Sequence, residues 1–164
     1  MNEGVEWAIH CAALMAATPA DIAVPMSVLA EFHAVPPSYL AKVLQSLAKA
    51  QIVMSSTGRH GGYRLARPAS DITLLDIVMA VDGEDGAFRC TEVRKRGPSA
   101  VEGSLYTPCC GIAAAMGRAE DAWRDALRNT TVADIVEMTF RDSPPVSLQK
   151  GITWVGNKLA ARSS

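Results

Sequence analysis

The sequence lacks the features that mark a membrane or secreted protein. No apolar run approaches the roughly 18 residues that a membrane-spanning helix requires. The apolar stretch from Trp7 to Ala17 is short and no basic segment precedes it, so we expect no signal peptide and a cytoplasmic location. Four cysteines in 164 residues are too few and too unevenly placed for the disulfide framework of a small secreted protein.

Motifs of the common enzyme classes are also missing. The chain has no glycine-rich phosphate-binding loop and no nucleophile elbow. Cys110 could act as a nucleophile with His10 or His60 as its base. His60, however, lies in a glycine-rich turn, and the interpretation of that turn given below accounts for His60 better than catalysis does. We therefore expect that the protein is not an enzyme.

Acidic residues are absent from one long segment, residues 32–70. The segment contains five basic residues, which are Lys42, Lys49, Arg59, Arg64 and Arg67. The whole chain has a formal charge of −1, so 11 basic and 17 acidic residues lie elsewhere. A nearly neutral protein that concentrates its positive charge on one segment marks the face that meets a polyanion. The charge pattern thus predicts contact with a polyanion, and double-stranded DNA is the starting hypothesis.

The order of elements around this segment is typical of a winged helix-turn-helix. Apolar periodicity predicts helices over residues 4–17, 25–32 and 38–49, with Ser38 as the N-cap of the third. Two strand-like runs, 52–55 and 63–66, then flank a glycine-rich turn that carries a cation. The predicted fold class is mainly α with a small β wing, followed by a long dimerisation helix.

The rest of the chain is expected to serve sensing and dimerisation. The whole chain then divides into four parts: a DNA-binding domain (1–82), a cysteine-bearing sensor loop (83–111), a dimerisation helix with a following short helix (112–140) and a loosely held C-terminal extension (141–164). Ser70 and Asp71 are expected to cap a fourth helix inside the first domain. The loop shows no helical or strand period, and its basic run 94–96 is expected to be solvated.

Eight polar side chains are candidates for DNA contact. The first turn of the third helix would enter the major groove, the wing tip would reach the minor groove, and hydroxyl groups would bind phosphates. The candidates are Ser27, Ser38, Tyr39, Lys42, Gln45, Thr57, Arg59 and His60. The alternative interpretation is a solvated basic face used for protein contacts.

Three segments resemble one family of bacterial regulators. They are Pro37–Leu44 (PSYLAKVL), Gly58–Ala66 (GRHGGYRLA) and Ile72–Val78 (ITLLDIV). Together they resemble the IscR/NsrR/RirA family, called here the Rrf-two family, over residues 4–140. The resemblance implies a homodimeric winged-helix transcription regulator with a long crossed helix, in which many members sense through an iron–sulfur cluster.

The cysteines depart from the pattern of that family. Cluster-binding members usually place three cysteines in the loop before the dimerisation helix, whereas here Cys90 fits the first position, Cys110 fits the last and the middle position is missing. Cys109 is adjacent to Cys110 and is treated as a spare, because neighbouring cysteines rarely ligate one iron well. Cys11 is expected to be a small core residue.

Two further ligands are expected from the first helix. Glu6 and His10 are four residues apart, so they lie on one helix face. In the Rrf-two family an acidic residue of this helix can reach the cluster of the partner subunit. The resemblance thus implies a 2Fe–2S cluster held by Cys90 and Cys110 of one chain and by Glu6 and His10 of the other. Two alternatives remain: Glu6 and His10 form an ordinary surface pair, and the regulator uses thiol oxidation or a ligand as its signal without a cluster.

Overall fold

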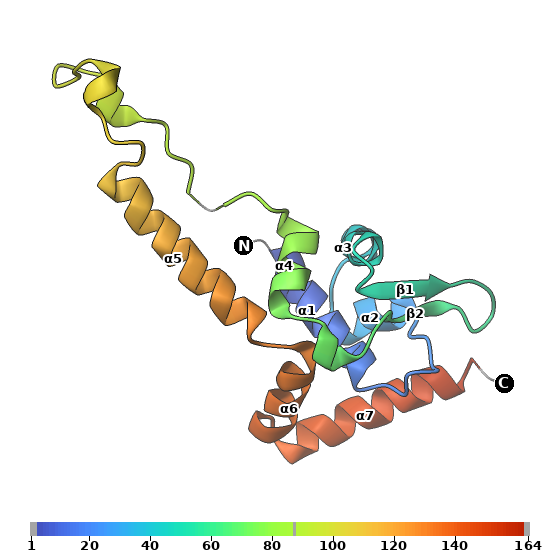
Figure 1. Ribbon diagram of the computed structural model, residues 1–164. Coiled ribbons are helices and arrows are strands. Elements are labelled where there is room, and N and C mark those ends of the chain that lie inside the picture. Colours follow the sequence, from blue (N-terminus) through green and yellow to red (C-terminus); the bar gives the residue numbers. More distant parts are fainter. Residues whose placement is uncertain (1–2, 87, 163–164) are drawn as a thin grey trace. The chain divides into compact units, whose positions relative to one another are not determined.

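The computed structural model describes residues 3–86 and 88–162 (Figure 1). The chain forms two units, one made of residues 1–83 and 127–164 and the other of residues 84–126. The α-helices and strands are α1 (Glu3–Ala16), α2 (Met26–His33), α3 (Pro37–Lys49), β1 (Val53–Ser56), β2 (Gly62–Leu65), α4 (Leu74–Asp82), α5 (Gly111–Arg128), α6 (Val132–Asp142) and α7 (Pro145–Ala160). This mainly helical fold with a two-stranded wing confirms the predicted fold class.

The core of the first unit lies between α1, α2, α3 and α4. The predicted apolar stripe of α3 is buried along its whole length and contacts α1, α2 and α4. The largest fully buried side chains include Leu29, Leu40, Leu44 and Leu47. Each such leucine contributes about 1.5–3 kcal/mol of burial free energy. The opposite, polar face of α3 is left free for a partner.

Two predicted helix starts are wrong, each for a local reason. α3 begins at Pro37 after Pro36, so Ser38 lies inside the first turn and does not cap the helix. Proline suits this first position because the N–H it lacks would have no partner there. α4 begins after Thr73 and not after Asp71, because residues on both sides of Thr73 pair with the chain around the start of α6. Leu74 N donates to Thr130 O at 2.8 Å, and Val132 N donates to Ile72 O at 2.9 Å.

The wing is fixed by a third extended segment. β1 and β2 pair antiparallel, from Val53 opposite Leu65 to Ser56 opposite Gly62. Val24, just before α2, then exchanges two 2.8 Å backbone hydrogen bonds with Tyr63. A Cβ atom on Gly62 would lie 2.6 Å from the carbonyl carbon and oxygen of Val24. Glycine is required there because the two backbones approach so closely.

Residues Pro145–Ala160 form a helix, α7, which corrects the expected loose extension. Pro145 starts α7, so the Pro144-Pro145 pair begins a helix and does not end the structure. Trp154 of α7 packs on Phe32 of α2 with ring centroids 5.6 Å apart. Lys158 Nζ also lies 2.7 Å from Glu31 Oε1. These contacts hold α7 against the winged helix.

The second unit contains the cysteine loop and most of α5. Among the described residues of α5 none is buried. Its apolar side chains Ile112, Met116 and Trp123 are 70%, 40% and 37% exposed. Met116 follows Ile112 by four residues and Trp123 follows Met116 by seven, so all three side chains lie on one helix face. An exposed apolar face of this kind is typical of a helix that packs against a partner. No helix of the described residues is both long and apolar enough to cross a membrane.

Candidate DNA-binding face and cysteine site

All eight predicted DNA contacts are exposed in the structure. Four lie on α3, and the others lie on α2 and the wing; they are Ser38, Tyr39, Lys42, Gln45, Ser27, Thr57, Arg59 and His60. The fold supplies a buried leucine face behind α3 and a hairpin beside it, so these side chains project from a fixed support. This arrangement can meet a major groove with α3 and an adjacent groove with the wing.

The ring of Tyr39 on this face contacts both Trp7 and Lys42. It is 52% exposed. Its ring meets the indole of Trp7 edge-on, with centroids 5.2 Å apart. Lys42 Nζ lies 6.0 Å from the same ring centroid, at the limit of a cation–π contact. The N-terminal end of α3 is therefore in direct contact with α1.

The positive field is smaller than the sequence count implies. Arg67 Nη2 donates to Asp76 Oδ2 at 2.9 Å, so the carboxylate from α4 neutralises this cation. The other four basic side chains of the segment, Lys42, Lys49, Arg59 and Arg64, are exposed. Exposed cations of this kind are the ones that displace counterions from a phosphate backbone.

Arg162 supports the wing and was missed by the sequence reasoning. Its Nη2 donates to the carbonyl oxygens of Arg59 at 2.7 Å and of Gly61 at 3.0 Å. The guanidinium joins the residue after α7 to the tip of the hairpin, and it adds a cation beside the wing. Nothing in the sequence signalled this contact, because it depends on the unexpected helix α7.

Cys90 and Cys110, separated by a long loop, lie side by side in the second unit. Cys110 directly precedes α5, and the Ala113 N–H donates to its Sγ at 3.3 Å. That hydrogen bond, followed by those from Cys90 and the Ile112 N–H, lowers the pKa of the Cys110 thiol, and the charge of Arg94 acts in the same direction. A helix N-terminus favours the thiolate, which is the form that binds metal. Cys109 is exposed and turns its thiol toward the Cys110 carbonyl at 3.5 Å.

Arg94 holds this loop together, which corrects the expected solvated basic run. Its side chain is only 23% exposed. Arg94 donates to the Thr107 carbonyl at 2.7 Å and to Glu92 Oε2 at 3.2 Å. Tyr106 lies under the guanidinium at 5.1 Å and donates from its hydroxyl to the Arg94 carbonyl at 2.8 Å. These bonds connect the chain after Cys90 to the chain before Cys110.

Glu6 and His10 are both exposed on α1, as their spacing predicts. The His10 ring lies 5.4 Å from the ring of His33. Burial, and secondly the charge of His10, lowers the pKa of His33 to about 4. Within the described residues of one chain, no three His, Cys, Asp or Glu side chains are grouped closely enough to hold a metal ion. Cys11 is fully buried, as expected.

Comparison with known proteins decides the family. The model of the Rrf2 family, described as iron-dependent transcriptional regulators, matches residues 1–138. The chain is a member of the Rrf2 family. This is the Rrf-two family that the sequence motifs resemble, and Rrf2 members are winged-helix transcriptional regulators. The match ends inside α6, so α7 and Arg162 lie beyond the part that defines the family.

Individual Rrf2 relatives cover nearly the whole chain. The HTH-type regulator YwgB of Bacillus subtilis is 27% identical over 155 residues, which are 94% of each protein. The HTH-type regulator Rv1287 of Mycobacterium tuberculosis is 28% identical over 164 residues, 100% of this chain and 92% of the relative. Among solved structures, CymR, the global cysteine regulator of B. subtilis, has a TM-score of 0.69 at 20% identity and covers 85% of this chain and 97% of its own. IscR of T. potens has a TM-score of 0.64 at 22% identity, and the match covers 84% of this chain and 85% of the IscR chain. These two structures share the winged-helix fold.

Proposed function

We propose that this Rrf2 regulator is a homodimer that binds double-stranded DNA and changes its DNA affinity with the state of a 2Fe–2S cluster. The observation that carries the proposal is the pairing of Cys90 with Cys110 at the N-terminus of α5, where the pKa of Cys110 is lowered. Thiolates are the usual ligands of such clusters. The sensor and the DNA reader then belong to one chain.

The exposed apolar face of α5 supports the dimer. Ile112, Met116 and Trp123 are too exposed for a helix that functions alone. A second copy of α5 packed against this face would remove the apolar surface from water, with alanines allowing close approach. A two-fold dimer would also present two copies of α3 to successive turns of a DNA duplex.

Each chain supplies two of the four ligands of a cluster site from its own cysteine loop. Cys90 and Cys110 supply two thiolates, and the described residues of one chain provide no third ligand beside them. Two exposed donors, Glu6 and His10, remain available on α1. In the proposed dimer, Glu6 and His10 of the partner subunit complete the set. The cluster would supply one-electron redox chemistry and a target for nitric oxide.

The structure suggests how this set of ligands acts on DNA. Glu6 and His10 flank Trp7 on α1, and Trp7 contacts Tyr39 at the reading end of α3. A change in how strongly Cys90 and Cys110 hold α1 of the partner subunit would shift Trp7 against Tyr39. DNA binding would respond only to the extent that the two positions of Tyr39 differ in DNA affinity.

An anaerobic purification tests this function. We expect visible absorbance with two irons and two sulfides per site in the wild type, and loss or shift of that absorbance in Glu6→Ala/His10→Ala. The matched control is Glu3→Ala, an exposed carboxylate of the same helix. A colourless wild type that iron and sulfide cannot reconstitute would contradict the cluster, while DNA binding would survive as the function.

A second candidate signal follows from the same geometry. Cys90 is hydrogen-bonded to Cys110, whose pKa is lowered, so peroxide could oxidise the pair to a disulfide. The two thiols would lose two electrons and two protons, and the peroxide would be reduced to water. Non-reducing peptide mapping after peroxide treatment of colourless protein separates the candidates: a Cys90–Cys110 disulfide that alters DNA affinity would support the thiol signal.

A further inference from the structure

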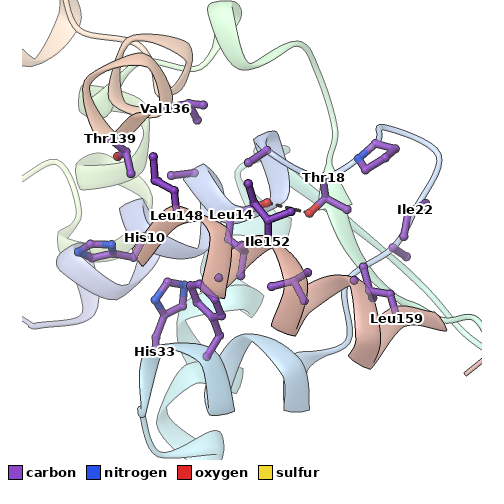
Figure 2. A pocket seen from close by; sticks show the side chains of 18 of the residues that line it. His10, Leu14, Thr18, Ile22, His33, Val136, Thr139, Leu148, Ile152 and Leu159 are labelled. Atoms are coloured by element: carbon purple, nitrogen blue, oxygen red, sulfur yellow. Dashed lines mark hydrogen bonds between the residues drawn. The ribbon is translucent and has the colours of Figure 1, made fainter. Parts of the chain in front are cut away.

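A large cavity lies within the first unit, between the winged helix and α7. Its volume is about 800 Å³, and α1, α2, α6 and α7 supply its walls. Leu14, Leu148 and Ile152 gather in its middle, His10 and His33 lie together at one end, and Ile22 and Leu159 lie at the other (Figure 2). Two lining residues already have proposed roles, His10 as a cluster ligand and His60 as a DNA contact, but the apolar side chains of the lining have a part in neither.

The cavity is too large to be a packing defect. Protein interiors are packed as densely as organic crystals, and their voids seldom exceed a water molecule. Small-molecule sites, by contrast, measure about 300–1,000 Å³ and are mainly apolar with a few polar groups. An open apolar space of this size leaves Leu148 and Ile152 of α7 facing solvent at a cost in free energy that a ligand would remove.

The lining indicates the chemistry of the ligand. The Thr18 hydroxyl donates to Leu14 O at 2.9 Å and the Thr139 hydroxyl donates to Ile135 O at 2.8 Å, so both donors are already used. Asp21 and Arg162 are the charged residues among the described lining, histidines apart. Arg162 is occupied by two wing carbonyls. Neutral carbonyl oxygens leave the charge of Arg162 in place, so the described lining holds one acidic and one basic residue beside its histidines. This balance favours neither an anionic nor a cationic ligand.

The imidazole end adds a limited polar character. His33 Nε2 is buried and has no hydrogen-bond partner among the described residues. A ligand that fits is neutral, mainly apolar and no larger than a drug-sized molecule.

The fourth wall, α7, connects the cavity to the DNA-binding face. One side of α7 is attached to α2 by the Lys158–Glu31 ion pair, and its end is attached to the wing by Arg162. A ligand seated between α7 and α1 would add contacts along α7 and so strengthen the position of Arg162. The wing backbone at Arg59 and Gly61 would be held more firmly as a result.

We propose that this cavity is an effector site for a neutral, mainly apolar small molecule, and that α7 transmits its occupancy to the wing. The binding part of the proposal rests on the volume and lining of the cavity, which shares only His10 with the proposed cluster site. The transmission part rests on the proposed DNA-reading role of the wing. A small molecule is favoured over a protein segment because the volume is that of a small-molecule site and helices of the same chain line the space.

The test uses the full-length protein and a neutral apolar fluorophore, N-phenyl-1-naphthylamine. Gly156 lies on the cavity wall, and a Cβ atom there would meet nothing within 4 Å. Gly156→Phe therefore fills part of the space, and it also improves helix propensity, so α7 is expected to form. Gly156→Ala is the matched control because it changes propensity with little change in volume.

We expect saturable binding of about one probe per chain. Gly156→Phe should weaken the affinity about tenfold or more, and a tenfold change in Kd corresponds to about 1.4 kcal/mol. Gly156→Ala should change the affinity little. Hydrogen exchange of the wing amides should slow when the probe is bound. Absence of saturable binding, or equal affinity in both variants, would overturn the site. Unchanged wing exchange at saturation would overturn the transmission. Probe binding that dissociates the protein into smaller species would identify the cavity as a contact between copies and would also overturn the proposal.

Discussion

The indole of Trp7 meets the ring of Tyr39 edge-on, with the ring planes at 81° and the centroids 5.2 Å apart. Trp7 belongs to α1, beside the proposed ligand Glu6, and Tyr39 belongs to the reading end of α3. Edge-to-face aromatic pairs have a preferred geometry, so a movement of one ring affects the other. This contact directly connects α1, which carries the proposed cluster ligands, to the candidate DNA-binding face.

The strength of that contact can be measured in a double-mutant cycle. Trp7→Ala and Tyr39→Ala should each destabilise the protein, and the double variant should be more stable than the sum predicts by about 0.5–1.5 kcal/mol. Urea unfolding of the four proteins gives the coupling free energy. Strict additivity would mean that the two rings do not interact.

Lys42→Ala should weaken DNA binding at all sequences. Lys42 is exposed on α3 and is 6.0 Å from the Tyr39 ring centroid. If its ammonium binds a phosphate, the salt dependence of log K falls by about one unit of slope in the variant. The measurement is Kd at several salt concentrations on one duplex selected from a random pool. Lys150→Ala, an exposed cation of α7, is the control, and equal effects of both variants would contradict a specific role of Lys42.

Gly62→Ala should damage the wing. Its Cβ atom would overlap the Val24 carbonyl, so the Val24–Tyr63 backbone pair must separate. We expect a loss of about 1–3 kcal/mol of stability, as for other overpacked sites, together with weaker DNA binding. Thermal unfolding measures the first effect. Gly156→Ala meets no neighbour and should be neutral or slightly stabilising; a harmless Gly62→Ala would show that the wing does not require this close approach.

The four thiols should differ in reactivity. Burial raises the pKa of Cys11 to about 12, so Cys11 remains a thiol at pH 8 and should react with iodoacetamide only after unfolding. Cys90, Cys109 and Cys110 should react in folded protein without a cluster. With the cluster bound, Cys90 and Cys110 should be protected while Cys109 stays reactive. Mass spectrometry of the alkylated peptides reads this pattern, and protection of Cys109 in place of Cys90 would refute the proposed ligand set.

The sequence predicted the elements whose signals are local. The apolar face of α3 and the glycine-rich wing formed as expected, because periodicity and short-range turn chemistry determine them. The starts of α3 and α4 were misplaced by a few residues. Tertiary pairing around Thr73 and the proline pair before α3 competed with the simpler capping signals.

Long-range contacts explain what the sequence could not show. α7 lies in the segment that was expected to be a loosely held extension, so the cavity and the contacts of Arg162 were missed with it. Arg94 was expected to be solvated, yet Thr107 and Tyr106, more than ten residues away, surround its guanidinium. The roles of Glu6 and His10 depend on a second chain, and they remain a proposal.

Mixed dimers test the central claim, which is that each cluster uses ligands from both chains. One chain carries Cys90→Ala/Cys110→Ala and the other carries Glu6→Ala/His10→Ala, and each forms a defective homodimer. The mixed dimer, purified through two different affinity tags and reconstituted anaerobically, regains one intact site if the ligands come from opposite chains. We predict about half of the wild-type iron, sulfide and visible absorbance, because one of the two sites of a two-fold dimer is restored. A mixed dimer as colourless as both parents, beside a coloured wild type, would contradict the account.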